Sequence, residues 1–405
     1  MSTAIIITFC TLLLTSYFFD LTSSKTKIPS VILLLALGWF VRQSTNFFGI
    51  GLPDFSPILP IIGSIGLILI VLEGSLELDL NKSKISLIKK SFFGAIIPML
   101  GLAFLFTYLF HHFGYFPIKD SLLNAIPLCI ISSAIAIPSV RNLNAQQKEF
   151  VIYESSISDI VGVIFFNFIF FNRYINIQAF GSFGLELLIE IVISLIATIV
   201  LAFLLSKIKT KIKFVPIILL VILIYEISKI YHLPALIFIL MFGLSIGNIE
   251  KAKKHKWMER FRLDILIKEV KKFKELTIEA TFLIRSLFFL VFGYLIEIRE
   301  VINLDSLKWA AVIVGIIFIF RLVQLLISKL PLIPLLFVSP RGLITILLFL
   351  AITPSNQILL VNRSLIIQVI LLSSLIMMFG LMITKKHTKV LVKKEKGEKD
   401  LTIEN

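Results

Sequence analysis

The sequence predicts an all-α membrane protein with about thirteen transmembrane helices. Hydrophobic residues make up 58% of the 405 residues, and the mean hydropathy is +0.98, whereas soluble domains contain roughly 45–50% apolar residues. The apolar residues form long runs between short polar loops, and most runs can cross a hydrocarbon core of about 30 Å as a helix. A helix pairs every backbone polar group within lipid, so we expect each run to be helical.

Thirteen apolar runs are candidate spans. In chain order they cover residues 3–20, 30–43, 57–78, 85–111, 121–140, 148–171, 183–206, 214–231, 233–249, 277–298, 306–328, 333–352 and 364–384. The first run lacks the basic segment and the small-residue cleavage site of a signal peptide, so we expect it to remain as a span. An odd number of spans places the two termini on opposite sides of the membrane.

The distribution of positive charge predicts the orientation. The chain has a net charge of +15 and 40 Lys and Arg residues. With the N-terminus outside and the C-terminus in the cytoplasm, 30 of these residues fall in inner loops and 7 in outer loops, while Arg285, Arg321 and Arg341 fall within spans. This is the positive-inside bias. It explains the basic composition without nucleic-acid binding, which we do not expect.

Two function classes are excluded by missing motifs. The sequence contains no GxxxxGK[ST] motif for ATP-driven pumping. It also lacks His-Glu-x-x-His and Gly-x-Ser-x-Gly motifs, so the chain is not expected to be an enzyme. Movement of a solute driven by an ion gradient is the remaining expectation, with no cofactor besides the transported ions.

Spans 1–6 and 8–13 form two six-span units of opposite orientation, with span 7 between them. This is the inverted-repeat plan of secondary transporters. Polar breaks occupy corresponding places, with Ser132, Ser133 and Pro138 in span 5 and 339–342 (Ser-Pro-Arg-Gly) in span 12. They predict crossed broken helices near the bilayer midplane. Two ordinary proline kinks are the alternative.

The segment 154–159 (Glu-Ser-Ser-Ile-Ser-Asp) carries the most informative chemistry. Ser155 and Asp159 are four residues apart and share a helix face, and Ser158 adds a hydroxyl beside them. A carboxylate with two hydroxyls offers hard oxygen ligands for Na⁺, K⁺ or Li⁺, and the buried carboxylate takes a proton when the ion leaves. One site then serves two ligands in turn, as exchange requires. A structural ion pair with packing serines is the alternative.

Four segments together resemble the sodium–proton exchangers of the monovalent cation–proton antiporter superfamily. Segment 154–159 resembles their Glu-Ser-x-x-Asn-Asp motif, and 71–79 (Val-Leu-Glu-Gly-Ser-Leu-Glu-Leu-Asp) resembles the end of their third helix. Segments 320–322 (Phe-Arg-Leu) and 340–342 (Pro-Arg-Gly) resemble their late arginine motifs. The resemblance covers essentially the whole membrane region, in the right order.

The resemblance implies roles for individual residues. Asp159 matches the residue that binds the cation and the proton, and Ser155 matches an ion ligand. Glu154 matches a buried glutamate that pairs with an arginine, for which Arg321 is the best match. Arg341 matches a second arginine near the broken helix, where it would offset half-helix dipoles.

The same resemblance implies a homodimer in the plasma (inner) membrane of a prokaryote. The transporter domain would be 1–384, with core spans 57–171 and 277–384 and scaffold spans 3–43 and 183–249. Residues 250–276 would form a basic cytoplasmic connector, and residues 385–405 a charged cytoplasmic tail.

Several positions leave alternatives open. Glu73 lies where some prokaryotic members carry an acid near the ion path, but it also fits the inner membrane interface. Arg321 could instead snorkel toward that interface, and Arg341 could be a simple packing cation. Ser158 replaces the family's Asn, and Ser132 and Ser133 replace its Thr-Asp. Ser133 and Ser158 are thus candidate ion ligands at which this sequence departs from the family. These departures leave the choice of ion open.

The sequence therefore predicts a secondary antiporter that exchanges a monovalent cation, Na⁺ first and K⁺ or Li⁺ as alternatives, for H⁺. One carboxylate at the Ser158–Asp159 pair predicts electroneutral 1:1 exchange by alternating access. An ion channel or non-transporting sensor of the same fold is the first rival. A carrier of organic anions that uses Arg341 is the second.

Overall fold

A computed structural model of the chain is built of helices joined by short connections. It describes residues 2–26, 28–50, 54–80, 84–141, 143–172, 176–208, 210, 212–254 and 263–401. The first eight helices are α1 (Ser2–Thr26), α2 (Ser30–Phe47), α3 (Leu59–Glu77), α4 (Ile85–Gly114), α5 (Ile118–Cys129), α6 (Ser133–Ser139), α7 (Ala145–Phe171) and α8 (Ile177–Lys207). The others are α9 (Phe214–Ile230), α10 (Leu236–Gly247), η2 (Ile249–Lys254), α11 (Leu263–Leu295), α12 (Ile298–Ile302), α13 (Leu304–Ile327), η4 (Leu335–Phe337), α14 (Leu343–Ala351) and α15 (Arg363–Leu401).

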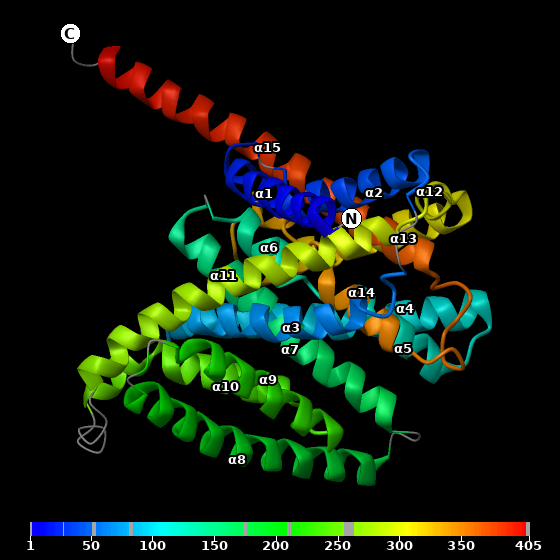
Figure 1. Ribbon diagram of the computed structural model, residues 1–405. Coiled ribbons are helices and arrows are strands. Elements are labelled where there is room, and N and C mark those ends of the chain that lie inside the picture. Colours follow the sequence, from blue (N-terminus) through cyan, green and yellow to red (C-terminus); the bar gives the residue numbers. More distant parts are fainter. Residues whose placement is uncertain are drawn as a thin grey trace.

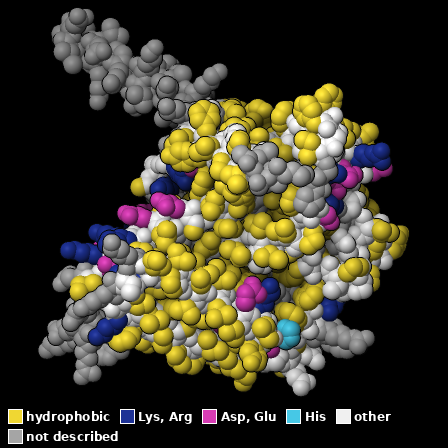
Figure 2. Space-filling view, viewed as in Figure 1, with side chains coloured by type: hydrophobic (Ala, Val, Ile, Leu, Met, Phe, Trp, Pro, Cys, Tyr) yellow, Lys and Arg dark blue, Asp and Glu magenta, His cyan; other side chains and the backbone are white. Residues whose placement is uncertain are grey.

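Every predicted span coincides with a helix or with an interrupted pair of helical segments. Within the described ranges, nine helical segments are long and apolar enough to cross a membrane, and the α5–α6 pair forms one of them. The other four predicted spans coincide with α2, α9, α10 and the η4–α14 pair. Figure 2 shows apolar side chains over the middle of one face, with charged side chains mostly toward its two edges. The chain is therefore an integral, multi-pass membrane protein.

The helices pack as two groups. The first contains α1, α2, α3, α8, α9, α10 and α11, in which α11 packs against α2 and α3, and α10 against α3 and α8. The second contains α4, α5, α6, α7, α13, α14 and α15, in which α4 packs against α5 and α7, and α13 against α15. In Figure 1, α8, α9 and α10 lie together along the lower edge, with α3 and α11 above them.

This grouping differs from the sequence prediction in two helices. The prediction placed spans 57–78 and 277–298 in the core with the ion-binding helix. In the structure, α3 and α11 pack mainly with scaffold helices, and α3 meets the second group along α7 and α14. Glycines explain the difference, because they bring α3 and α11 into close contact with scaffold partners.

Glycines form two close seams within the first group. A Cβ at Gly38 of α2 would overlap the backbone of α11 near Leu290, and one at Gly293 of α11 would overlap the backbone of α2 near Leu35. At the α3–α10 contact, a Cβ at Gly247 would lie 2.7 Å from the carbonyl oxygen of Leu76. Since a backbone cannot move aside as a side chain can, these contacts require residues without a Cβ.

Part of the predicted inner connector is helical. The sequence assigned residues 250–276 to it, but helix α11 already begins at Leu263 and continues without interruption to Leu295. Residues 255–262 of the connector and 402–405 of the tail lie outside the described residues. Helix α12 was not predicted, because five residues are too few to show an apolar period.

Candidate ion-binding site

Two interrupted segments cross in the second helix group. Helix α5 ends at Cys129 and α6 begins at Ser133, while residues 338–342 separate η4 from α14. The Ser132 amide donates a hydrogen bond of 2.9 Å to the Pro340 carbonyl, which joins the two interruptions. A Cβ at Gly342 would lie 2.6 Å from Ser132 Oγ, so the crossing is close.

Arg341 satisfies backbone carbonyls at this crossing. Its Nε donates to the Leu128 carbonyl oxygen at 2.7 Å, and one Nη donates to the carbonyl oxygen and hydroxyl of Ser339, both at 3.1 Å. Leu128 lies in the last turn of α5, where carbonyls lack helical partners and carry partial negative charge. The arginine therefore stabilises the end of a half-helix. Its backbone amide donates to Ser373 Oγ of α15.

Asp159 of α7 lies against the first interruption. Its Oδ2 accepts hydrogen bonds from the Ser133 hydroxyl and, at 3.3 Å, from the Ser133 amide at the start of α6. Asp159 is 1% exposed, and its Oδ1 has no hydrogen-bond partner among the described residues. The structure thus brings Ser133 to Asp159 and leaves one carboxylate oxygen open.

The two other serines have local partners. Ser158 Oγ accepts a 3.0 Å hydrogen bond from the Ile131 amide, which anchors the extended segment between α5 and α6. Ser155 Oγ donates to the Val151 carbonyl of its own helix at 2.7 Å. Both hydroxyls are buried on the helix that carries Asp159. In this arrangement Ser133 contacts the carboxylate, and Ser155 and Ser158 would have to turn toward an ion to bind it.

Glu154 is paired with a cation inside the protein. Its Oε1 lies 2.5 Å from Arg321 of α13, and both side chains are 1% exposed. Gln324, one turn further along α13, also donates to this oxygen and accepts from Arg321 at 3.0 Å. Arg321 Nε donates to the Leu335 carbonyl oxygen at 3.1 Å. The structure pairs the two residues that the sequence paired, in a buried setting rather than at an interface.

Glu73 lies in a separate charged cluster near the predicted inner end. Its electrostatic neighbours include Arg285 and Arg141, and Thr281 of α11 lies within hydrogen-bond reach. Asp20 of α1 contacts Arg141 at 3.1 Å and Arg285 at 3.9 Å. No hydrogen bond between Glu73 and Asp159 occurs in the described part of the chain. Within this arrangement Glu73 belongs to a network of charges rather than to the Asp159 site.

Sequence reasoning missed Gln324 and Asp20, the partner of Arg285. Asp20 is the last residue of the first predicted span, where an acid is easily taken for the start of a loop. The available signal was Arg285 itself, since a buried arginine needs a counter-charge. Gln324 follows Arg321 by three residues, a spacing that places both side chains on one helix face.

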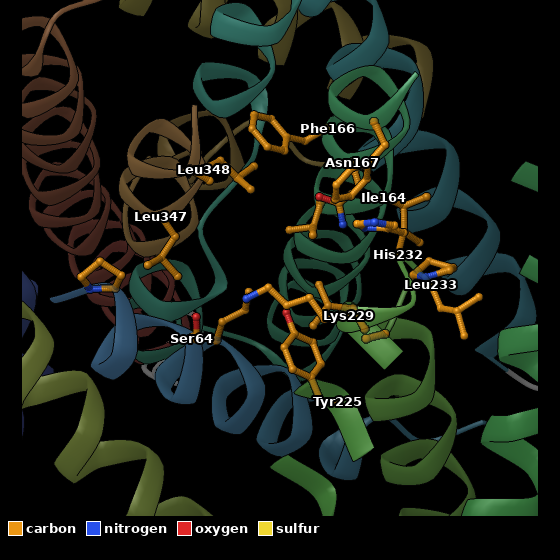
Figure 3. Close-up of a pocket in the computed structure, with 18 of the residues that line it drawn as sticks. Ser64, Ile164, Phe166, Asn167, Tyr225, Lys229, His232, Leu233, Leu347 and Leu348 are labelled. Atoms are coloured by element: carbon orange, nitrogen blue, oxygen red, sulfur yellow. The ribbon is translucent and has the colours of Figure 1, made fainter. Parts of the chain in front are cut away.

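A cavity of about 220 Å³ opens between the two helix groups on the predicted outer side (Figure 3). Its walls come from α3, α7, the α9–α10 turn and α14. Its polar lining includes Ser64, Asn167, Tyr225, Lys229 and His232. The cavity reaches Val163, which is four residues beyond Asp159 on α7, a rise of about 6 Å along the helix.

Ion pairs join the two groups on the opposite, predicted inner side. Lys84, before α4, lies 3.1 Å from Asp79, after α3, and 2.8 Å from Glu149 of α7. The Tyr153 hydroxyl of α7 donates to the Asp79 carbonyl oxygen at 2.7 Å. The Arg141–Asp20 pair also connects the groups. Asp159 therefore lies between an outer cavity and an inner boundary held by polar contacts.

One protein family matches most of the chain. Residues 9–386 match the family described as sodium/hydrogen exchanger, transmembrane. The chain belongs to this family. It is accordingly a transporter of the cation/proton antiport class rather than an enzyme.

Solved structures show the same fold. The sodium proton antiporter MjNhaP1 from Methanocaldococcus jannaschii at pH 8 superposes with a TM-score of 0.63 at 17% identity, covering 94% of this chain and 96% of that chain. An electron-microscopy structure of MjNhaP1 gives a TM-score of 0.66 at 18% identity, covering 98% and 99%. No curated protein sequence matches the chain.

Proposed function

We propose that the protein exchanges Na⁺ for H⁺ one-for-one at Asp159, with K⁺ and Li⁺ as alternative substrates. The supporting observation is the open Oδ1 of a carboxylate that is 1% exposed and lies beside two crossed helix interruptions. A charged carboxylate without a partner is unstable in a buried position, so either a proton or a cation occupies it. Two ligands that exclude one another at one carboxylate give coupled, electroneutral exchange.

Hydroxyl oxygens complete the proposed cation site. Ser133 Oγ already contacts Asp159, and Ser155 and Ser158 lie within one turn of it on α7. A change of side-chain rotamer would redirect the Ser155 hydroxyl from the Val151 carbonyl to a bound ion. Carboxylate, hydroxyl and carbonyl oxygens are ligands suited to hard cations. In this proposal Glu73 assists the inner approach to the site rather than binding the ion in the state described.

Alternating access would move one helix group against the other. The outer cavity reaches to one turn from Asp159, while ion pairs at Asp79 and Asp20 join the groups on the inner side. This is the asymmetry expected of an outward-facing state. Thirteen spans in two inverted repeats, an outer N-terminus, a cytoplasmic C-terminus and a homodimer complete the proposal.

The rival functions fit the contacts less well. An organic-anion carrier would need Arg341 to bind the substrate, but its Nε and one Nη already donate to protein oxygens. A channel needs a route open to both sides at once, whereas cavity and ion pairs lie on opposite sides of Asp159.

Exchange in liposomes tests the proposal. Purified protein is reconstituted around a pH-sensitive dye, an inward or outward proton gradient is imposed, and Na⁺, K⁺ or Li⁺ is added. We expect cation-dependent collapse of the gradient by the wild type and at least a ~100-fold slower response by Asp159→Asn, because Asn cannot bind the proton. Glu186→Gln, on the partly exposed face of α8, is the matched control and should behave as wild type.

Full exchange by Asp159→Asn would refute this mechanism. A cation-driven current at zero initial potential would refute the 1:1 stoichiometry, since electroneutral exchange moves no net charge. Cation flux that proceeds without counter-transported protons would support the channel reading instead.

A further inference from the structure

A second buried carboxylate lies in the scaffold, on α8. Glu190 is 0% exposed, and neither of its carboxylate oxygens has a hydrogen-bond partner in the described part of the chain. No ion pair within the described ranges includes it, although the nearby α9 carries Lys229. The exchange mechanism proposed above does not use this residue.

The surroundings of Glu190 are rich in hydroxyls. Ser194 and Thr198 follow at intervals of four residues on the buried face of α8, and their hydroxyls also lack partners among the described residues. The Ser228 hydroxyl of α9 faces the carboxylate. Elsewhere in the structure, buried helical hydroxyls such as those of Thr277 and Thr281 donate to the carbonyl four residues earlier. The hydroxyls of Ser194 and Thr198 make no such hydrogen bond.

The opposite face of α8 is apolar and exposed. Leu185, Leu188 and Val192 are 55% to 65% exposed, as expected for side chains against lipid. The polar column therefore points into the protein, toward α9 and α10, rather than toward headgroups. An unpaired carboxylate at such a position requires a bound positive charge or a proton.

The column and the wall of the outer cavity share helix α9. Tyr225 and Lys229 of α9 line that cavity, and Ser228 lies beside both of them on the same helix. Helix α9 thus contributes Ser228 beside the Glu190 carboxylate and Tyr225 and Lys229 to the cavity wall. A small cation that enters the cavity would need only side-chain movement on α9 to reach the carboxylate.

From this geometry we infer a second monovalent-cation site, in which Glu190, Ser194 and Ser228 supply carboxylate and hydroxyl oxygens to Na⁺ or Li⁺. Its donors are of the same kind as those near Asp159, one buried carboxylate with hydroxyls. The difference is that Asp159 already accepts two hydrogen bonds from Ser133, whereas Glu190 has only the Ser228 hydroxyl facing it and no hydrogen bond of normal geometry within the described residues. The site lies in the scaffold and is separate from the exchange site.

Cation-dependent thermal stabilisation tests this inference. Unfolding of the purified protein is followed by tryptophan fluorescence while NaCl or LiCl replaces choline chloride at constant ionic strength. A ligand that binds only the folded state raises Tm in a saturable way. We expect Asp159→Asn to retain a saturable rise, and Asp159→Asn/Glu190→Gln to show none. Asp159→Asn/Glu186→Gln is the matched control and should retain it.

A second variant tests the site with Glu190 in place, should Glu190→Gln fail to fold. Ser194→Ala in the Asp159→Asn background should raise the half-maximal Na⁺ concentration at least ~3-fold. The inference is overturned if Asp159→Asn shows no cation-dependent rise, or if Glu190→Gln leaves that rise unchanged; the first result would mean that Glu190 holds only a proton. Because these assays measure binding in the absence of exchange, their outcome is independent of whether Asp159 carries transport.

Discussion

Glu154 and Asp159 lie five residues apart on α7, and both are 1% exposed, yet their surroundings differ sharply. Glu154 binds Arg321 and Gln324, so its charge is neutralised within the protein. Asp159 has hydroxyl and amide contacts from Ser133 and no cationic partner within the described residues. If Asp159 binds the transported ion as proposed, pairing rather than burial separates the structural carboxylate Glu154 from the ion-binding one.

The largest expected effect comes from breaking the Glu154–Arg321 ion pair. Arg321→Ala leaves Glu154 as an uncompensated buried charge, and removal of one partner of a buried pair costs about 3–5 kcal/mol. We therefore expect a strong decrease in the thermal unfolding midpoint of the detergent-solubilised protein. Asp159→Asn, measured in parallel, should change the midpoint little, because no charged partner loses its counter-charge.

The double variant Glu154→Leu/Arg321→Met controls for lost packing. It removes both charges together, so it should recover most of the stability lost in Arg321→Ala. Equal destabilisation by Arg321→Ala and Asp159→Asn would contradict the distinction between the two carboxylates.

A smaller effect should follow from removing the Ser133 hydroxyl, which contacts Asp159. Ser133→Ala deletes the hydroxyl that contacts Asp159, and one such interaction contributes about 1 kcal/mol. We expect the half-saturating cation concentration for exchange to rise roughly 3- to 10-fold in the liposome assay. Ser158→Ala is the comparison: its hydroxyl accepts from the Ile131 amide and would have to turn toward the ion, so we expect a smaller rise than for Ser133→Ala. A larger affinity change for Ser158→Ala than for Ser133→Ala would reverse the assigned roles.

The smallest effect concerns the exposed ion pairs that join the helix groups. Hydrogen bonds from Lys251 and Lys84 hold the pKa of the Asp79 carboxyl below its usual value. A lowered pKa stabilises the folded state above the unfolded pKa of about 3.9, and this contribution is lost as the pH falls through the folded value. Because Asp79 is 43% exposed, screening limits the contribution to less than about 1 kcal/mol.

This pH dependence can be measured by comparing the unfolding midpoints of wild type and Asp79→Asn between pH 7 and pH 3. The wild type should be slightly more stable at pH 7, and the difference should disappear toward pH 3 and shrink in high salt. A difference that grows on acidification would have the wrong sign for this carboxylate.

The helices could be predicted from the sequence because lipid imposes length and polarity on each of them. All thirteen predicted spans coincide with helical segments, and the interruption between Cys129 and Ser133 was signalled by polar residues in an apolar run. The pairing of Glu154 with Arg321 was implied by the resemblance to the exchanger motifs, and it agrees with the cost of burying single charges. These features depend on local composition and on a rule that applies to any membrane interior.

Assignment of helices to groups could not be predicted in the same way. It depends on which helix backbones approach closely, and glycines at positions 38, 247 and 293 have that effect only opposite particular partners. The partner of Arg285 was missed for a similar reason, because Asp20 is distant in sequence and lies at the end of a span. Ser155 and Ser158 share the helix with Asp159 as expected, but competing backbone groups take up their hydroxyls.

The glycine seams should make the scaffold resist deformation. Backbones in direct contact resist sliding, since many short-range attractions would have to be lost together. The seams at Gly38 and Gly293 join α2 to α11, the seam at Gly247 joins α3 to α10, and α3 also packs against α11, so we expect these four helices to move as one unit. Elastic deformation during a rocking motion would then concentrate along the boundary with α7 and α14, where the packing is already hollow. The scaffold is closely packed on one side of Asp159, and the packing on the other side is looser. A small rotation of one helix group against the other would then expose the carboxylate.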